Sequence, residues 1–403
     1  MRAAAFVYPW DIAGDPAAAR RVADLGVRSA TLAAAYHSTR ALTPRHPRHR
    51  IVTARHSAVY YPPDRARWAG RELRPRPQEW VAGPDPYAEA ARALADAGVE
   101  VHSWVILAHN SRLGEEHPGS TVRNAFGDRY PWAPCIARPE VRDYAVTLAA
   151  EAAARPGTSG TELESCGWYG LEHLHAHDKI GGAPLGGVGA YLMSLCFCEV
   201  CRGGYAAHDA DPEELRETVV RALAPVFAGR PAPAPGDRAE EWAEITALLG
   251  DRRAAAVAGW RDATADAFQR AAVAAVRAAA PPGFRVLLHA DPAPHRCGAN
   301  VGTDPAGVLA HADGVVVPCA GGPAAATAAL GPFVPHLRQG GTLAANFPVV
   351  AGMGGRPATL AADAAHAAGL GATELRLYHA GLATDEDLRA VTEALRELDR
   401  AGG

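Results

Sequence analysis

The chain repeats one pattern along its length, a short apolar run followed by a stretch with the periodicity of a helix. A strand buried on both faces reads as a continuous apolar run, and parallel neighbours need a crossover that is usually a helix. The repeat therefore predicts an α/β fold, a closed (β/α)8 TIM barrel, with a doubly wound open sheet as the alternative. The predicted strands are residues 3–8, 27–36, 99–108, 160–168, 284–290, 314–317, 342–346 and 373–378.

A strongly helical region separates the fourth predicted strand from the fifth. Residues 205–282 contain long Ala-rich helical patterns, interrupted by the Pro-rich segment GRPAPAPGD. The 403 residues, 48% of them hydrophobic, suffice for one large barrel or two ordinary domains. We expect a single barrel domain over residues 1–403, with residues 205–282 as a helical insertion between strands 4 and 5.

Charge and composition argue against several classes of partner. The 40 basic and 44 acidic residues give a net charge of -4, which offers no field to hold a nucleic acid. No apolar stretch has the form of a signal peptide or the length of a membrane span. The 7 cysteines, an odd number, favour a reducing compartment over a disulfide framework. We therefore expect a cytoplasmic protein that acts on a small molecule, and a homo-oligomer is compatible with the sequence.

Aromatic, histidine and amide side chains recur at the predicted strand ends. Active sites of (β/α)8 barrels lie at the carboxyl ends of the strands, so these residues should share one rim. Tryptophan and tyrosine rings there could stack on the apolar face of a sugar, although each could equally serve packing. The candidate substrate-binding residues are Trp10, Tyr36, His37, Asn110, Trp168, His289, Asn346 and Tyr378.

Three residues are candidates for acid and base chemistry. A carboxyl at Glu172, beside Trp168 and Tyr169, would have its pKa raised by desolvation, as a general acid requires; the alternative is an ion pair with a loop arginine. His173 could transfer protons near neutral pH or bind a sugar hydroxyl. Asp291 could activate water in an inverting reaction, or it could cap the segment that follows.

Three cysteines lie within six positions. Cys196, Cys198 and Cys201 form a C-x-C-x-x-C run, which can supply three thiolates to a tetrahedral zinc ion from one tight loop. Cys135 is the candidate for the fourth ligand, with His177 and Cys297 as alternatives. A closed four-cysteine site would be structural, because it leaves no open position for substrate. The other interpretation is a group of buried reduced thiols.

Histidines 173, 175 and 177 alternate, so in an extended chain they would share one face. With Asp178 or His289 they could hold a catalytic metal ion, or they could simply donate hydrogen bonds.

The segments PCIARPEVRDYAVTLAAEAAAR, GWYGLEHLHAHD and CFCEVC together resemble the zinc-binding region of the glycoside hydrolase family 42 β-galactosidases, which are clan A (β/α)8 enzymes. In that family a cysteine precedes an arginine by seven positions, as Cys135 precedes Arg142 here. The positions that follow the family's order are Gly167, Trp168, His177, Asp178, Cys196, Cys198 and Cys201. The resemblance implies a structural zinc on these cysteines and activity on a glycoside.

The departures from the family fall on the catalytic positions. Where the family has Asn followed by its acid/base Glu after the fourth strand, this chain has Glu172 followed by His173. Where the family has a nucleophilic Glu at the end of the seventh strand, this chain offers Asn346 and no carboxylate. A retaining mechanism needs two carboxyl groups about 5 to 5.5 Å apart.

The sequence thus predicts a glycoside hydrolase-like enzyme that acts on a small glycoside and carries a structural zinc. Two alternatives remain open. One is a metal-dependent sugar isomerase or epimerase with Glu172, His289 and Asp291 as ligands. The other is a sugar-binding relative that has kept the zinc scaffold without the catalytic pair.

Overall fold

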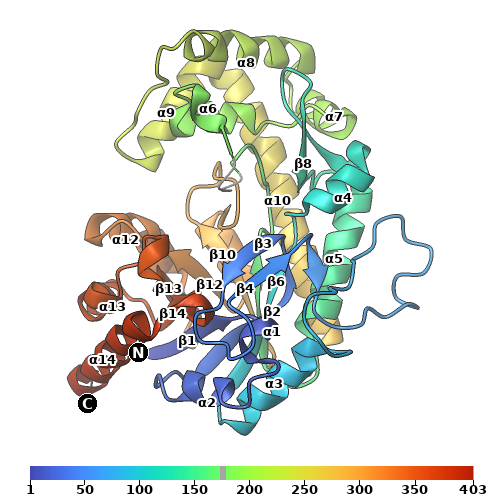
Figure 1. The fold of residues 1–403 in the computed structure, drawn as a ribbon. Helices are drawn as coiled ribbons and strands as arrows, with labels where there is room; N and C mark the ends of the chain where they lie inside the picture. Colours follow the sequence, from blue (N-terminus) through green and yellow to red (C-terminus); the bar gives the residue numbers. More distant parts are fainter. Residues whose placement is uncertain (173–177, 403) are drawn as a thin grey trace.

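A computed structural model describes residues 1–172 and 178–402 of the chain (Figure 1). Its main sheet is a closed barrel of parallel strands, because β1 (Arg2–Val7) pairs with both β14 (Glu374–Tyr378) and β2 (Ser29–Tyr36). The chain therefore forms a (β/α)8 TIM barrel, as the sequence predicts, and not an open sheet. The other barrel strands are β6 (Glu100–Ile106), β9 (Gly160–Glu164), β10 (Arg285–Asp291), β12 (Gly314–Pro318) and β13 (Thr342–Pro348).

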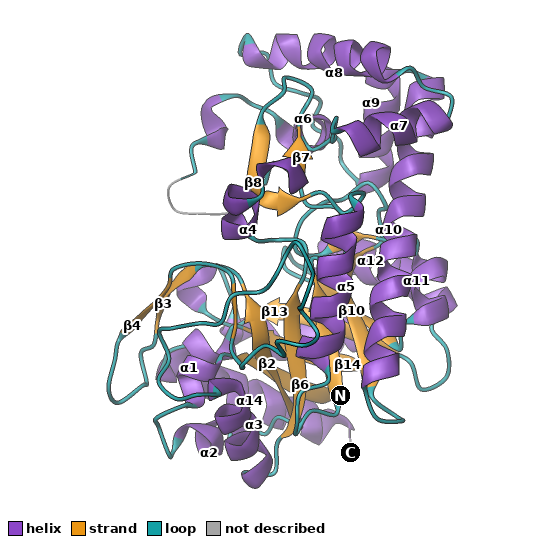
Figure 2. Cartoon of the chain, turned by 90° about the vertical axis from the view of Figure 1, so that its right-hand side faces the viewer, coloured by secondary structure: helices purple, strands orange, loops and turns teal. Residues whose placement is uncertain are grey.

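Helices surround the barrel and extend beyond its carboxyl end (Figures 1 and 2). Several begin at an N-cap that satisfies free backbone N–H groups; Asp85, for example, accepts a hydrogen bond of 2.9 Å from Ala88 N. The α-helices are α1 (Pro9–Ile12), α2 (Ala18–Ala23), α3 (Pro86–Asp96), α4 (Ser111–Glu116), α5 (Pro139–Ala153), α6 (Gly186–Met193), α7 (Glu199–Ala207), α8 (Pro212–Phe227), α9 (Arg238–Leu249), α10 (Asp251–Ala279), α11 (Pro305–His311), α12 (Pro323–Leu330), α13 (Leu360–Gly369) and α14 (Asp385–Gly402). The short 3-10 helices are Pro118–Ser120, Ile180–Gly182, Gly331–His336, Ala351–Met353, Pro357–Thr359 and Ala380–Leu382.

The chain between β9 and β10 carries five α-helices, α6 to α10. Figures 1 and 2 show α6, α7, α8 and α9 gathered in a layer beyond the carboxyl ends of the barrel strands. The longest helix, α10, runs from this layer down the side of the barrel and packs against α5. Within the predicted helical region, Gly250 separates α9 from α10 with a φ of 81°, a value that glycine adopts without strain.

The remaining strands lie in the connections between barrel elements. The long loop after β2 forms the antiparallel hairpin of β3 (Thr39–Leu42) and β4 (Ile51–Ala54), and then β5 (Ala58–Val59), which pairs with β2. A second hairpin, β7 (Thr121–Arg123) and β8 (Arg129–Pro134), follows β6, and β11 (Val301–Gly302) pairs with β10.

The fourth barrel strand ends earlier than predicted. The sequence suggests residues 160–168, whereas β9 ends at Glu164. Ser165 has a positive φ of 54°, and its N–H donates to Ala299 O at 2.9 Å, so the backbone leaves the barrel sheet there. This boundary decides which carboxylate stands at the strand end.

None of the helices within the described part of the chain has both the length and the apolar character to cross a membrane.

Candidate active site

Two glutamates from β9 point into the barrel. Glu162 and Glu164 are separated by two positions on a strand, so their side chains share one face, and they are 0% and 3% exposed. Their surroundings differ, and their pKa values are shifted in opposite directions.

Glu164, the last residue of β9, is enclosed by aromatic hydrogen-bond donors. Its Oε2 accepts a hydrogen bond from the Trp104 indole Nε1 at 2.9 Å and another from the Tyr378 hydroxyl at 3.4 Å. Both bonds reach the same oxygen; Oε1 has no hydrogen bond partner among the described residues. Burial raises the pKa of Glu164, against the lowering effects of nearby His289 and of the two donors. A carboxyl with a raised pKa is suited to donate a proton.

Glu162, one layer deeper, is held as a carboxylate. Its Oε1 accepts hydrogen bonds from Arg376 Nε at 2.7 Å and Thr31 Oγ1 at 3.1 Å. Burial would raise the pKa of Glu162, but the Arg376 guanidinium and the neighbouring His289 and His102 outweigh it and lower the pKa to about 2. Arg376 also pairs with Glu374 at 2.8 Å, so the guanidinium joins two carboxylates inside the barrel.

His289 connects the two glutamates. This residue of β10 is 1% exposed; its Nε2 lies 3.4 Å from Glu162 Oε2 and its Nδ1 lies 3.7 Å from Glu164 Oε2. Two carboxyls with pKa values shifted in opposite directions thus share one imidazole. Such separation of pKa values is typical of sites that carry out acid and base chemistry.

Aromatic rings line the strand ends around Glu164. The Tyr8 hydroxyl donates to the Tyr36 hydroxyl at 3.1 Å and lies 2.8 Å from His379 Nδ1. Burial lowers the pKa of His379 to about 3, so its imidazole is neutral at physiological pH. Tyr378 and His379 are half-buried, with ring centroids 3.8 Å apart. The carboxyl end of the barrel therefore presents flat rings together with a carboxyl whose pKa is raised.

The candidate substrate-binding residues occupy different environments. Tyr36 and Tyr378 lie at the rim beside Glu164, and His289 lies between the two glutamates. Asn346 is 6% exposed, and its Oδ1 is buried without a hydrogen bond partner. Trp10 is buried and stacks on Tyr8 at 4.3 Å, and His37 stacks on Tyr36 at 4.2 Å.

Asn110 and Trp168 have structural contacts. Asn110 caps α4, because its Oδ1 accepts from Leu113 N at 3.0 Å, and its Nδ2 donates to the Tyr144 hydroxyl at 3.3 Å. Trp168 is buried under the guanidinium of Arg261, 4.5 Å from its ring centroid, and its Nε1 donates to Arg261 O at 2.9 Å. These contacts explain both positions without a substrate.

Glu172 and Asp291 lie further from the barrel interior than Glu164. Glu172 is exposed, eight positions beyond the end of β9, in a small cavity that Glu241, His295 and Arg296 also line. Asp291 forms an ion pair with Arg238 of α9, and its Oδ1 accepts from Ala293 N at 2.9 Å, so it does cap the segment that follows. The candidate His173, like His175 and His177, lies outside the described residues.

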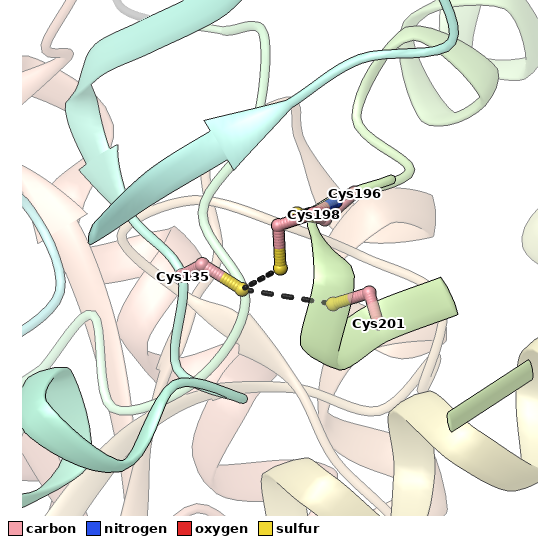
Figure 3. Close-up of side chains that lie close together, drawn as sticks. All are labelled: Cys135, Cys196, Cys198 and Cys201. Carbon is pink, nitrogen blue, oxygen red and sulfur yellow. Dashed lines mark hydrogen bonds between the residues drawn. The ribbon is translucent and has the colours of Figure 1, made fainter. Parts of the chain in front are cut away.

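The four predicted metal ligands converge at a second site (Figure 3). Cys135 follows β8, and Cys196, Cys198 and Cys201 lie at the start of α7; all four are buried, with their sulfur atoms within 4.8 Å of one another. Cys135 Sγ lies 3.9 Å from Cys198 Sγ and 3.6 Å from Cys201 Sγ. A tetrahedral zinc with bonds of about 2.3 Å would set its sulfur ligands about 3.8 Å apart, which these spacings fit.

The backbone around the cysteines supports the same arrangement. Arg123 N and Cys198 N each lie 3.5 Å from Cys196 Sγ, and both N–H groups point at the sulfur. These backbone contacts help to fix the position of the sulfur within the cluster. The cluster could hold a metal ion, and it is the one group of three or more His, Cys, Asp or Glu ligands found within residues 1–172 and 178–402.

The fold is shared with known carbohydrate-active enzymes. No protein-family model matches the chain, and no curated protein does. Among solved structures, α-L-fucosidase isoenzyme 2 from Paenibacillus thiaminolyticus matches with a TM-score of 0.58 and 14% identity over 99% of this chain and 49% of that one. The β-galactosidase of Marinomonas ef1 matches with a TM-score of 0.56 and 11% identity over 100% of this chain and 60% of the other.

A third match spans nearly the whole of both chains. The PgaB (BpsB) glycoside hydrolase domain from Bordetella bronchiseptica has a TM-score of 0.55 and 14% identity over 99% of this chain and 98% of its own. The chain thus spans about half to three fifths of the fucosidase and β-galactosidase chains. At these identities the likeness establishes the fold, a (β/α)8 barrel of the kind found in glycoside hydrolases.

Sequence reasoning missed Glu162, Glu164, Trp104 and Arg376 as site residues. The alternation in Gly160–Glu164 places both glutamates on one face of the strand, which was an available signal. Because the predicted strand extended to residue 168, Glu172 and not Glu164 was predicted to follow the strand end.

Proposed function

We propose that the protein is a glycoside hydrolase whose site lies at the carboxyl rim of the barrel, with Glu164 as the general acid. The observation that carries this proposal is Glu164 itself, a carboxyl with a raised pKa at the end of the fourth barrel strand, next to aromatic rings and with no described residue bonded to Oε1. The glycoside hydrolases among the structural neighbours and the family 42-like cysteine motif support the same class.

Glu164 would protonate the glycosidic oxygen of the leaving group, and the C–O bond would break as that proton is transferred. The Trp104 and Tyr378 donors would then stabilise the carboxylate that remains. Rings such as those of Tyr36 and Tyr378 would pack against the sugar.

Asp291 remains our prediction for the second carboxyl. It lies two positions beyond His289 on β10, so both side chains share the face that turns towards the barrel axis and mouth. The Arg238 ion pair would hold the Asp291 carboxylate in place at the rim, where it could accept a proton from water. Glu172 and His173 also remain candidates from the sequence, and Glu172 is tested beside Glu164.

The proposal is tested with matched Glu→Gln variants. We expect Glu164→Gln to lose aryl glycoside hydrolysis, whereas Glu172→Gln retains it, with both variants folded by circular dichroism. A panel of aryl α- and β-glycosides of glucose, galactose and fucose supplies the substrates. Loss of hydrolysis in Glu172→Gln alone would assign the role of general acid to Glu172. Full activity in both variants would refute the carboxyl mechanism.

We also propose that the metal at the four cysteines is zinc with a structural role. A four-thiolate site leaves no open position, so zinc there would hold the β7–β8 hairpin and the start of α7 together and take no part in the reaction.

The metal-dependent isomerase is less consistent with the geometry. Glu172, His289 and Asp291 do not form a ligand group among the described residues, and Asp291 is already paired with Arg238. The second alternative, a sugar-binding protein without catalytic activity, would use the same rim residues. It would bind a glycoside in the panel and cleave none of them.

A further inference from the structure

A wide cleft separates the helical layer from the barrel. Its volume is about 1030 Å³, at the upper end of the range of about 300–1,000 Å³ typical of ligand pockets. One wall is α9 with Trp242, the floor is the loop after β10 with His295, and the opposite wall is α12, which presents Ala324 and Ala328. We call it the insertion cleft.

Ion pairs fix the α9 wall to the floor. Glu241 accepts hydrogen bonds from His295 Nε2 and from Arg296 Nη1, both at 2.9 Å, and Arg238 pairs with Asp291. These contacts link the helical layer to the loop after β10 at several points. The cleft is therefore a built feature with defined walls.

The Arg238 contact also locates the cleft relative to the proposed active site. Asp291 lies on β10 two positions beyond His289, whose ring is 3.7 Å from Glu164. A strand rises about 3.3 Å per residue, so Asp291 is about 7 Å further towards the mouth. Arg238 reaches Asp291 from α9 and lines the cleft. One wall of the cleft therefore reaches the rim at the end of β10, the strand next to the one that carries Glu164.

The lining favours a neutral, polar ligand with flat faces. The acidic and basic side chains balance, three aspartates or glutamates (Asp237, Glu241, Asp262) against three arginines (Arg238, Arg261, Arg296), and Glu241 is paired with Arg296. A ligand with a strong net charge would find little unbalanced countercharge.

Aromatic and small residues complete the lining. The Trp242 indole is half-buried, 5.6 Å from the His295 ring at an interplanar angle of 29°, with Tyr191 edge-on at 6.0 Å. Ala324 and Ala328 are exposed and leave the opposite wall free of bulky side chains. An aromatic platform among hydrogen-bonding groups is suited to sugar rings.

We propose that the insertion cleft binds the leaving-group portion of an elongated neutral glycan, so that the substrate is an oligosaccharide and not only a small glycoside. This inference rests on the proposed function, because Glu164 defines where the bond breaks. The sugar on the glycosyl side of the cleaved bond would occupy the rim near Glu164. The sugars of the leaving group, on the other side of that bond, would lie along Trp242.

Chain length and a filled cleft test the proposal. The substrates are free di-, tri- and tetrasaccharides of glucose and galactose in both anomeric series, in which the leaving group lengthens with the chain, and the products are separated by chromatography. We expect kcat/KM to rise about tenfold or more from di- to tetrasaccharide. Ala324→Trp, which adds an indole to an exposed position in the cleft, should abolish that rise, mainly through KM.

The matched control is Ala243→Trp, at an exposed position of α9 that does not line the cleft, which should keep the chain-length dependence. Equal kcat/KM for all lengths, or an unchanged dependence in Ala324→Trp, would overturn the proposal. If nothing is cleaved, calorimetric titration with the free tetrasaccharides separates the two hypotheses. Binding that Ala324→Trp removes supports the cleft while the hydrolase assignment fails, and no binding to the wild-type protein overturns the cleft.

Discussion

The Trp104 indole donates a hydrogen bond of 2.9 Å to Glu164 Oε2, across neighbouring strands of the barrel. The contact places a neutral donor against a carboxyl whose pKa is raised by burial, and the other oxygen, Oε1, has no partner within residues 1–172 and 178–402. A proton donor held in this way is oriented before substrate arrives. Its protonation state should therefore control the rate.

The pH dependence of hydrolysis should report Glu164. Because a general acid acts in its protonated form, the rate should fall as pH rises through the raised pKa of Glu164. Glu164→Gln should lower kcat by a factor of about 10² to 10⁴ and remove this alkaline limb. Tyr378→Phe removes a donor that favours the ionised carboxylate, so the limb should move to higher pH. An alkaline limb that persists in Glu164→Gln would assign the titration to another group.

The buried pair of Glu162 and Arg376 should stabilise the fold only as a pair. Arg376→Met leaves a carboxylate at a position with 0% exposure, which should cost about 3–5 kcal/mol of unfolding free energy, measured by urea denaturation. The double variant Glu162→Gln/Arg376→Met removes the stranded charge and should recover much of that loss. A double variant no more stable than Arg376→Met would show that the pair's charges are not the cause.

The loss of folding stability at low pH should also depend on Glu162. The pKa of Glu162 in the folded protein, about 2, lies below its ordinary value of 4.5, so its ionised form stabilises the fold above about pH 4.5. That contribution should disappear as pH falls from about 4.5 towards 2. Wild-type protein should therefore lose more stability than Glu162→Gln over this range, and parallel acid curves would contradict the assignment.

Some of these features can be predicted from a short stretch of sequence, whereas others depend on residues that only the folded chain brings together. Most barrel strands could be predicted because they contain short apolar runs, and the four cysteines because their number and spacing suit a metal site. The pair of Glu162 and Arg376 spans 214 positions, so nothing local couples them. Glu164 was missed for a different reason, since the positive φ of Ser165 ends β9 where the apolar pattern continues through Cys166 and Trp168.

The four-cysteine site should contain about one zinc per chain. Cys198→Ser should lose the metal, measured by plasma mass spectrometry, and lower Tm by about 5 °C or more, because binding energy at a structural zinc is folding energy. Cys319→Ser, at a buried thiol outside the cluster, should keep the metal. Protein without metal, or metal loss in Cys319→Ser alone, would contradict the site.

Asp11 should destabilise the protein in its charged form. Its Oδ2 accepts a hydrogen bond from Tyr8 N at 2.9 Å, whereas its Oδ1 is buried without a partner. Gly381 packs against this carboxyl so closely that a Cβ there would lie 1.8 Å from Oδ2. Burial raises the pKa of Asp11 to about 7, although the Tyr8 N–H and the Arg45 charge act to lower it.

The sign of the pH effect follows from that raised pKa. Below the ordinary pKa of 3.8 the carboxyl is neutral in both the folded and the unfolded chain; as pH rises towards about 7 the unfolded chain ionises first, and stability is lost. Asp11→Asn keeps an oxygen for the Tyr8 N–H and removes the charge. Its Tm should equal that of wild type near pH 4 and exceed it by about 2 °C or more above pH 7. A Tm difference that is constant between these pH values would place the ionisation of Asp11 at its ordinary value.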